Sequence, residues 1–164
     1  MIATRWGATD AEVAAPQPCD ALAGAGATHA DRAISIEAPL GVVYRWLCQL
    51  RAAPYSYDLL DNFGQRSPRT LTPGFEQLAL GQRVMKLFTV ASFVPDKHLT
   101  IKSGRHTAVT YAVRPEPNGT RLAVRAAFTL SRSVTQLLLI GDLVMMRKQL
   151  LTLKGLAERD GAGS

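Results

Sequence analysis

The segment at residues 32–62 places a strand, an apolar helix and a polar-aromatic loop in immediate succession. Ile34 and Ile36 point to one face of a strand over residues 32–38. An apolar helix follows at once over residues 40–50, and the loop after it carries two tyrosines and a serine. A strand that leads into a helix beside such a loop is typical of a curved sheet that begins to wrap an interior. The segment therefore predicts a fold with an interior, without specifying what occupies it.

Several antiparallel strands are predicted after a long loop at residues 65–81. Asn118 and Gly119 form a dipeptide that strongly favours a hairpin. In the arm that follows the hairpin, apolar side chains alternate from Leu122 to Leu130, which predicts a sheet with one buried and one wetted face. The predicted strands cover residues 83–94 (two strands, 83–88 and 89–94, or a single bent one), 98–103, 107–114 and 121–130.

The last element is a long helix over residues 134–158. Apolar residues recur along it at alternating steps of four and three, which predicts a single stripe that packs on the sheet. A second short helix is expected at residues 57–63. The order predicts an α+β fold in which a curved antiparallel sheet wraps around the C-terminal helix, with two short helices after the first strand. The stripe consists of Leu139, Leu143, Met146, Leu150, Leu153 and Ala157.

The 164 residues are about the length of one domain. We expect an extended N-terminal arm at residues 1–31, rich in small residues and proline, a single domain at residues 32–160 and a short tail at residues 161–164. Trp6 is the one large aromatic residue of this arm, and we expect it to dock onto the domain, because an isolated tryptophan is more often docked than free. A sheet and a helix that diverge at one end leave a cavity between them, and ligands bind in such cavities.

Composition excludes several classes of function. The net charge is +6, but the basic residues are scattered, which argues against nucleic acid as the partner. The longest apolar-rich stretch, residues 134–146, is too short to span a bilayer, so no membrane insertion is predicted. Cys19 and Cys48 are predicted to be reduced thiols of a cytoplasmic protein, and no signal peptide is recognised. The three histidines have no metal spacing, and neither a metal nor a cofactor is predicted.

Seven short motifs resemble those of the SRPBCC superfamily, whose members share the helix-grip fold and include START lipid-transfer domains, the major birch pollen allergen and bacterial polyketide cyclases. The resemblance covers nearly the whole chain and is closest to a bacterial branch of largely uncharacterised members. None of the motifs is a catalytic signature. They are RWGATDAE at residues 5–12, IEAP at 36–39, WLCQ at 46–49, YSYD at 55–58 with DN at 61–62, LGQ at 80–82, TRL at 120–122 and MRKQLL at 146–151.

This resemblance implies a helix-grip fold whose cavity binds a hydrophobic small molecule such as a lipid or a polyketide. The chain departs from the family in two places. Residues 51–54 read Arg-Ala-Ala-Pro where a glycine-rich stretch is usual, and Cys19 stands where a glycine often follows the arm prolines. Both changes affect the expected cavity mouth.

The loop at residues 55–58 holds the most reactive-looking side chains. Tyr57 and Asp58 at a cavity mouth could orient or deprotonate a polar ligand head, and His106 could act as a general acid or base. In the alternative interpretation, Asp58 caps a short helix, the tyrosines pack over the helix before it, and His98 and His106 lie on the surface. Asp142 either faces solvent or lines the cavity.

Three hypotheses follow. The first is a binding module for a hydrophobic small molecule, and the second is a polyketide cyclase-like enzyme with acid/base residues at the cavity rim. The third is a protein-interaction role, which includes a homodimer, because the arm is unusual and the last helix is basic. The sequence pattern does not distinguish side chains that line a ligand pocket from side chains that simply fill the core. The residues expected to line the ligand are Tyr55, Tyr57, Phe88, Phe93, Tyr111, Phe128, Leu139, Leu143 and Met146.

Overall fold

The computed structural model describes residues 4–55 and 66–163. Seven strands form one sheet in the order β1-β2-β7-β6-β5-β4-β3. β1 runs parallel to β2, and the other neighbours pair antiparallel. The elements are β1 (Arg5–Trp6), α1 (Asp10–Ala14), α2 (Pro18–Ala23), β2 (Thr28–Ile36), α3 (Leu40–Cys48), the 3-10 turn η2 (Gln49–Arg51), β3 (Arg83–Val84), β4 (Phe88–Val94), β5 (His98–Ser103), β6 (Thr107–Glu116), β7 (Gly119–Phe128) and α5 (Arg132–Ala162).

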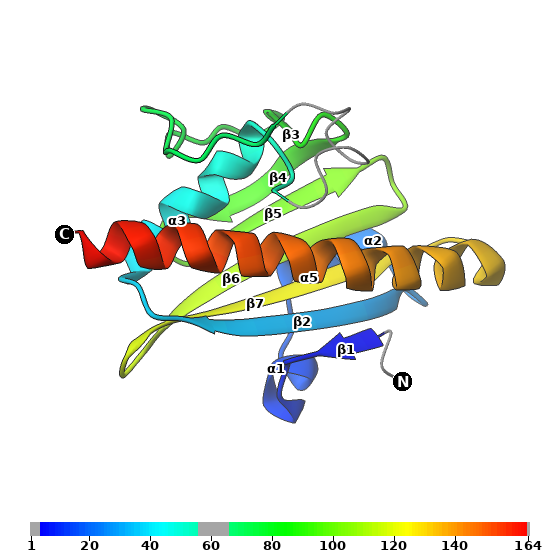
Figure 1. Cartoon of the computed structure of the whole chain (residues 1–164). Helices are drawn as coiled ribbons and strands as arrows, with labels where there is room; N and C mark the ends of the chain where they lie inside the picture. The colour runs from blue at the N-terminus through cyan, green and yellow to red at the C-terminus, as the bar shows by residue number, and fades with distance from the viewer. Residues whose placement is uncertain (1–3, 56–65, 164) are drawn as a thin grey trace.

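The long helix α5 crosses one face of the curved sheet, with α3 beside its C-terminal half (Figure 1). This is the helix-grip α+β arrangement, so the predicted fold class is confirmed. The prediction for a second short helix at residues 57–63 lies outside the described residues. α5 itself begins two residues earlier and ends four residues later than predicted.

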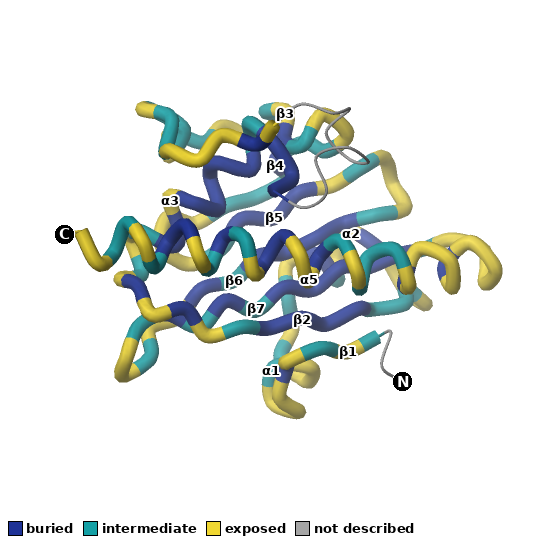
Figure 2. The backbone as a smooth tube through the Cα atoms, in the orientation of Figure 1, coloured by how far each residue is buried: buried dark blue, intermediate teal, exposed yellow. Residues whose placement is uncertain are grey.

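The main core lies between the sheet and the two helices α3 and α5. Alternate residues of β2, β6 and β7 face this layer, and they are paired in register across the three strands. Figure 2 shows the sheet and the inner side of α5 as buried. Burial of these side chains is the main stabilising force for the grip. The largest fully buried apolar members are Trp46, Tyr55, Tyr111, Ile36, Leu47, Leu50, Leu99, Ile101, Leu122, Leu150 and Leu153.

The opposite face of the sheet is covered by the N-terminal segment, so the prediction of a wetted second face is wrong. Cys19 and Ala23 of α2 pack on Ala108 and Ala127 in a second buried cluster. The main-chain amide of Cys19 donates to the hydroxyl of Thr110 at 3.0 Å. Alanines on this face leave room for a helix to approach closely, which a simple reading of polar alternation does not reveal.

The prediction of an extended arm at residues 1–31 is therefore wrong for the described part of this segment. α1 begins with a capping box, in which the Thr9 hydroxyl accepts from the Glu12 amide and the Glu12 carboxylate accepts from the Thr9 amide. Trp6 lies in β1, paired with Arg32 of β2, and is half-buried. Residues 28–31 extend the strand that was predicted to begin at residue 32.

Two arginines of β7 tie the N-terminal segment to the back of the sheet. Arg121 makes a two-pronged contact with Glu12, at 2.7 and 2.9 Å. Arg125, which is buried, contacts Asp31 at 2.8 Å and Asp20 at 3.0 Å, and also donates to the main-chain carbonyls of Val13 in α1 and of Ala15 directly after it. Planar guanidinium groups suit such multiple acceptors. The segment is thus an integral layer of the fold.

Two predicted strand boundaries change in the structure. Residues 83–94 form two strands, because Met85 and Lys86 adopt positive φ angles of 47° and 64° and turn the chain between β3 and β4. The hairpin predicted at Asn118 and Gly119 is confirmed, with a tighter connection than expected. Its strands continue to Glu116 and restart at Gly119, which are paired with each other.

The C-terminal half of α5 is anchored by apolar and polar contacts. Leu150, Leu153 and Ala157 are buried against the sheet and α3. The Trp46 indole donates to Asp160 at 3.0 Å, and Glu158 accepts from the main-chain amide of Glu37 at 2.9 Å. The N-terminal turns of α5 extend past the sheet and are largely exposed (Figures 1 and 2).

Candidate functional site: a polar row beneath α5

A buried ion pair joins the sheet to the N-terminal half of α5. Arg32 of β2 donates from Nη2 to the Oδ2 atom of Asp142 at 3.0 Å. The side chain of Arg32 is 1% exposed, and that of Asp142 is 14% exposed. Replacing such a pair by apolar side chains is often neutral or stabilising, so folding alone does not require it. This makes the pair the first candidate for function.

Burial displaces the ionisation of both partners toward their neutral forms. It raises the pKa of Asp142 to about 6, against the opposing effect of the Arg32 guanidinium. Burial likewise lowers the pKa of Arg32, although Asp142 and Asp31 counteract it. A carboxyl group whose pKa lies near neutrality can exchange a proton at physiological pH. Asp142 is the one described carboxyl group of the interior with this property.

A second polar contact lies seven residues, or about two turns, further along α5. The Tyr111 hydroxyl of β6 donates to the Oε1 atom of Gln149 at 2.9 Å. The Gln149 amide nitrogen donates in turn to the main-chain carbonyl of Pro54 at 2.6 Å and lies 3.4 Å from the sulfur of Met85. Burial raises the pKa of Tyr111, so its hydroxyl remains a proton donor.

Arg32 and Tyr111 belong to one row across the sheet. Both are in register with Val124 of the strand between them. Asp142 and Gln149, seven residues apart, lie on the side of α5 that faces this row. We call these four residues, Arg32, Tyr111, Asp142 and Gln149, the polar row. It offers a cation, a carboxyl group, a hydroxyl and an amide within an otherwise apolar layer.

Most of the expected ligand-lining residues that the structure describes are buried in the main core or pack against it. Tyr55, Tyr111, Phe128, Leu139 and Met146 belong to the main core cluster, and two partly buried phenylalanines of β4 pack against it. Leu143 is half-buried and is not part of that cluster. The two phenylalanines are Phe88 and Phe93.

The expected catalytic residues do not form a described site. Tyr57 and Asp58 lie outside the described residues. His106 is exposed in the turn between β5 and β6. His98 is half-buried, and burial lowers its pKa. Tyr55 is buried and meets Trp46 edge to face, with ring centroids 5.8 Å apart.

Arg32 and Gln149 are members of the polar row that sequence reasoning missed. Arg32 has the same strand parity as Ile34 and Ile36, which is the available signal that it faces the core. Gln149 follows Asp142 by seven residues and Met146 by three, so its helical position also predicts an inward side chain. Of the two alternatives for Asp142, the structure supports the interior one.

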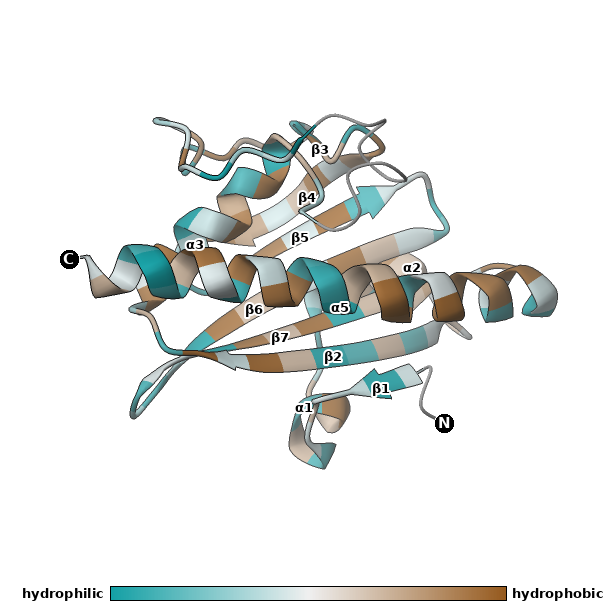
Figure 3. Ribbon diagram, viewed as in Figure 1, coloured by the Kyte–Doolittle hydropathy of each residue, from teal (hydrophilic) through white to brown (hydrophobic). Residues whose placement is uncertain are grey.

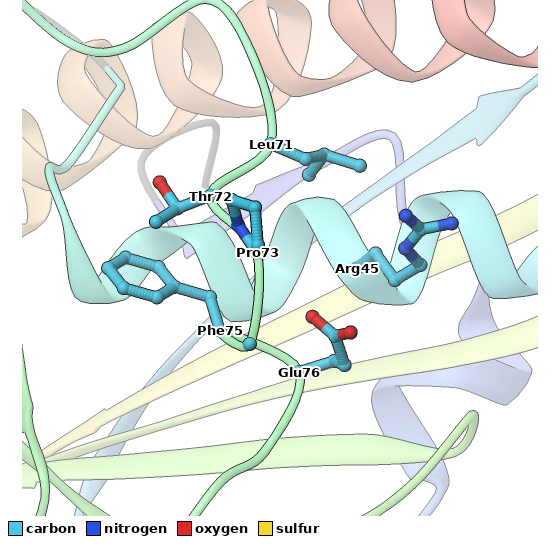
Figure 4. A pocket seen from close by; sticks show the side chains of 7 residues that line it. Arg45, Leu71, Thr72, Pro73, Phe75 and Glu76 are labelled. Carbon is cyan, nitrogen blue, oxygen red and sulfur yellow. The ribbon is translucent and has the colours of Figure 1, made fainter.

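Two surface hollows lie outside this interior. One, of about 220 Å³, is formed by Arg45 of α3 and the loop at residues 71–76, which passes over the outer side of α3 (Figure 4). There Gln49 and Thr72 exchange two hydrogen bonds at 2.8 and 2.9 Å. The other hollow, of about 340 Å³, lies between Arg69 and the outer side of α5. Neither adjoins the polar row.

Comparison with known proteins identifies the fold. No family model matches the sequence, and no curated protein matches it. Among solved structures, a protein of Nitrosomonas europaea aligns with a TM-score of 0.53 and 14% identity, over 82% of this chain and 96% of the other. A Mesorhizobium loti protein aligns with a TM-score of 0.52 and 17% identity, over 80% and 97% of the two chains.

A third structure adds a family description. A Corynebacterium glutamicum protein described as polyketide cyclase-like aligns with a TM-score of 0.50 and 15% identity, over 84% of this chain and 95% of that protein. The chain therefore shares the helix-grip fold of these structures, which is the fold that the sequence motifs predict. At these identities the likeness concerns the fold.

Within residues 4–55 and 66–163, no helix has both the length and the apolar content needed to cross a bilayer. The same residues contain no group of three or more His, Cys, Asp or Glu side chains arranged to hold a metal ion. Cys19 and Cys48 are both buried as free thiols.

Proposed function

We propose that the chain binds a hydrophobic small molecule between the sheet and the N-terminal half of α5, with a polar group of the ligand held by the polar row. The observation that carries this proposal is the buried Arg32–Asp142 pair, supported by Tyr111 and Gln149. Ligand sites combine apolar walls with a few placed polar groups, and this interior has both.

The ligand class follows from the chemistry of the row. Arg32 presents a guanidinium group that suits a carboxylate, sulfonate or phenolate oxygen. The surrounding cluster, which includes Phe128, Leu139 and Met146, suits an apolar body, and Met146 can adapt its shape to it. An amphipathic acid, with a lipid-like or polycyclic body, combines the two requirements.

Entry of the ligand would separate α5 from the sheet at its N-terminal half. The C-terminal half is held by Trp46, Asp160 and buried leucines, whereas the Arg32–Asp142 pair links the other half to the sheet. An acidic ligand that takes the place of Asp142 beside Arg32 would preserve the charge balance. The helix could then move outward without leaving a buried unpaired cation.

Native mass spectrometry of the purified protein tests whether a hydrophobic molecule co-purifies. A fluorescence titration with 1-anilinonaphthalene-8-sulfonate, an apolar anion, tests the site itself. We expect saturable binding that weakens at least tenfold in Arg32→Met, because a hydrogen bond to a charged group is worth about 1.5 kcal/mol or more. Far-UV circular dichroism checks that the variant is folded.

Arg45→Met is the matched control, because Arg45 lines the hollow outside α3. We expect this variant to bind the probe as the native chain does. If Arg45→Met loses binding and Arg32→Met keeps it, the probe occupies the outer hollow and the proposal is wrong.

A polyketide cyclase-like activity is a second candidate, and one observation favours it. Asp142 has a pKa of about 6 in an apolar interior and lies near the hydroxyl of Tyr111, so it could remove and return a proton. Asp142→Asn would abolish conversion of a molecule recovered from the native protein, whereas a pure binding role would leave that molecule unchanged by either form. Liquid chromatography with mass detection distinguishes the two results.

A further inference from the structure

The outer side of α5 carries a second stripe, opposite the one that packs on the sheet, in which four apolar side chains are interrupted by two glycines and one lysine. Its residues are spaced alternately by three and four, which is the heptad pattern of helix-to-helix packing. Leu137 is 73% exposed and Val144 is 50% exposed. We call this stripe the outer seam; it consists of Val134, Leu137, Gly141, Val144, Lys148, Leu151 and Gly155.

The two ends of the outer seam differ in shape. At the N-terminal end, Val134, Leu137 and the neighbouring Ile140 are exposed apolar side chains. Figures 2 and 3 show that this end of α5 is largely exposed and carries several hydrophobic residues. At the C-terminal end, Leu151 and Gly155 border the hollow of about 340 Å³ that Arg69 closes on one side. One end therefore protrudes, and the other is recessed.

We infer that the outer seam is the interface of a symmetric homodimer in which the two α5 helices pack antiparallel. A two-fold axis at Val144 places each Leu137 against Leu151 of the second copy. The same axis places Val134 opposite position 154, next to Gly155, and Lys148 opposite position 140, next to Gly141. The protruding end of each seam thus fills the recessed end of the other, which is the self-complementarity that a two-fold interface requires.

The glycines explain why a second copy fits better than an unrelated helix. A Cβ atom at Gly141 or at Gly155 would meet nothing within 4 Å in the monomer, so the packing of the single chain does not call for glycine at either place. Glycine is costly inside a helix. In the antiparallel dimer, each glycine lies where a larger residue of the other copy needs space.

A parallel pair of helices is disfavoured by the same residues. In that arrangement every seam residue faces its own counterpart, so Lys148 would meet Lys148 and Leu137 would leave the hollow beside Gly155 unfilled. Like charges in direct contact oppose association. The antiparallel arrangement avoids both problems because it sets the stem of Lys148 beside a glycine.

Sedimentation velocity over a range of concentrations measures the association of the full chain. We expect the mass to approach twice the 17.7 kDa of one chain as concentration rises. Val144→Lys should weaken dimerisation at least tenfold, because it places two like charges at the axis. Gln136→Lys, an equal charge change at an exposed position outside the seam, is the matched control and should leave dimerisation unchanged.

Substituting a seam glycine separates loss of the interface from loss of the fold. Gly141→Leu meets open space in the monomer, so the single chain should fold at least as well as the native one, yet the added side chain would collide with Lys148 of the second copy. Gly41→Leu, an exposed glycine in α3 with equally open surroundings, is the control and should remain dimeric.

Cross-linking tests the position of the axis. Both native cysteines are buried, and burial raises the pKa of each thiol, so they should not compete in oxidation. Val144→Cys should form a covalent dimer under mild oxidation, and Gln136→Cys should not. The result appears on a non-reducing gel.

The inference would be overturned by a monomer at every concentration with no cross-link through position 144, or by a dimer that survives both Val144→Lys and Gly141→Leu. Cross-linking through position 136 in preference to 144 would overturn it as well. A chain that stays monomeric but co-sediments with anionic phospholipid vesicles through Leu137 and Ile140 would assign the seam to a membrane surface, and would equally overturn the dimer.

Discussion

Asp142→Asn is the substitution that most directly tests the described interior. The native side chain is buried beside Arg32 beneath α5, and burial raises its pKa from an ordinary value of 3.8 to about 6. Asparagine has nearly the same shape but does not ionise in the accessible pH range. The substitution therefore removes one titration and leaves the surrounding residues in place.

The sign of the effect is set by which state holds the proton more tightly. Between about pH 4 and pH 6, the folded chain keeps the Asp142 proton while the unfolded chain has released it, so the free energy of unfolding falls as pH rises. Two pKa units correspond to about 3 kcal/mol in total, of which about 2 kcal/mol falls between pH 4 and pH 7. This is a cost of ionising a buried group that Arg32 offsets only in part.

Urea unfolding of both proteins at several pH values measures this effect. Other groups titrate in the same pH range. Their contributions are the same in the native chain and in Asp142→Asn, so they cancel in the difference between the two free energies of unfolding. We expect the native chain to lose about 2 kcal/mol relative to Asp142→Asn from pH 4 to pH 7. Asp96→Asn, at an exposed turn, is the matched substitution.

A difference that stays flat over this range would refute the reasoning, because it would mean that Asp142 ionises as freely in the folded chain as in the unfolded one. A difference that favours the native chain increasingly as pH rises would refute it in another way. In that case the attraction of Arg32 would exceed the cost of burial, and the pair would be a stabilising element of the fold.

Three other substitutions test parts of the structure by urea unfolding. Tyr111→Phe should cost about 1–3 kcal/mol, because a buried acceptor on α5 loses its donor, and an unchanged midpoint would contradict that contact. Glu12→Gln should cost about 1–2 kcal/mol of unfolding free energy at neutral pH, because it weakens the contact with Arg121. That contact lowers the pKa of Glu12, so the cost should vanish as acid protonates the native carboxylate. A cost independent of pH would count against the ion pair. Gly119→Ala should cost more than about 2 kcal/mol, because the φ angle of Gly119 is 154° and the added Cβ would lie 2.1 Å from a carbonyl oxygen. Gly24→Ala, whose surroundings are open, should cost less. Equal costs would contradict the close approach at Gly119.

The order of elements could be predicted from sequence because it depends on local pattern. Strand alternation from Leu122 onward, the Asn118–Gly119 turn and the stripe of α5 are each visible within a short window. The position of the N-terminal segment was not predictable in that way. It depends on contacts such as Glu12 with Arg121, between residues 109 positions apart.

The polar row illustrates the same limit. From sequence alone, Asp142 either faces solvent or lines the interior, and only its partner across the layer decides between the two positions. Arg32 is 110 residues away from Asp142 in sequence, and nothing local pairs the two. Periodicity predicts which face a side chain occupies, whereas the identity of its partner follows from how the sheet curves beneath α5.

The two edges of the sheet limit how this chain can associate. β1 and β3 are two residues long, and the main-chain groups of β2 beyond β1 are engaged by α5: Lys154 donates to the carbonyl of Ser35, and Glu158 accepts from the amide of Glu37. Long unpaired edges invite strand addition and open-ended fibres. With its edges short and partly occupied, the chain is shielded from that route even when it is concentrated, and self-association through a helix would end at a pair.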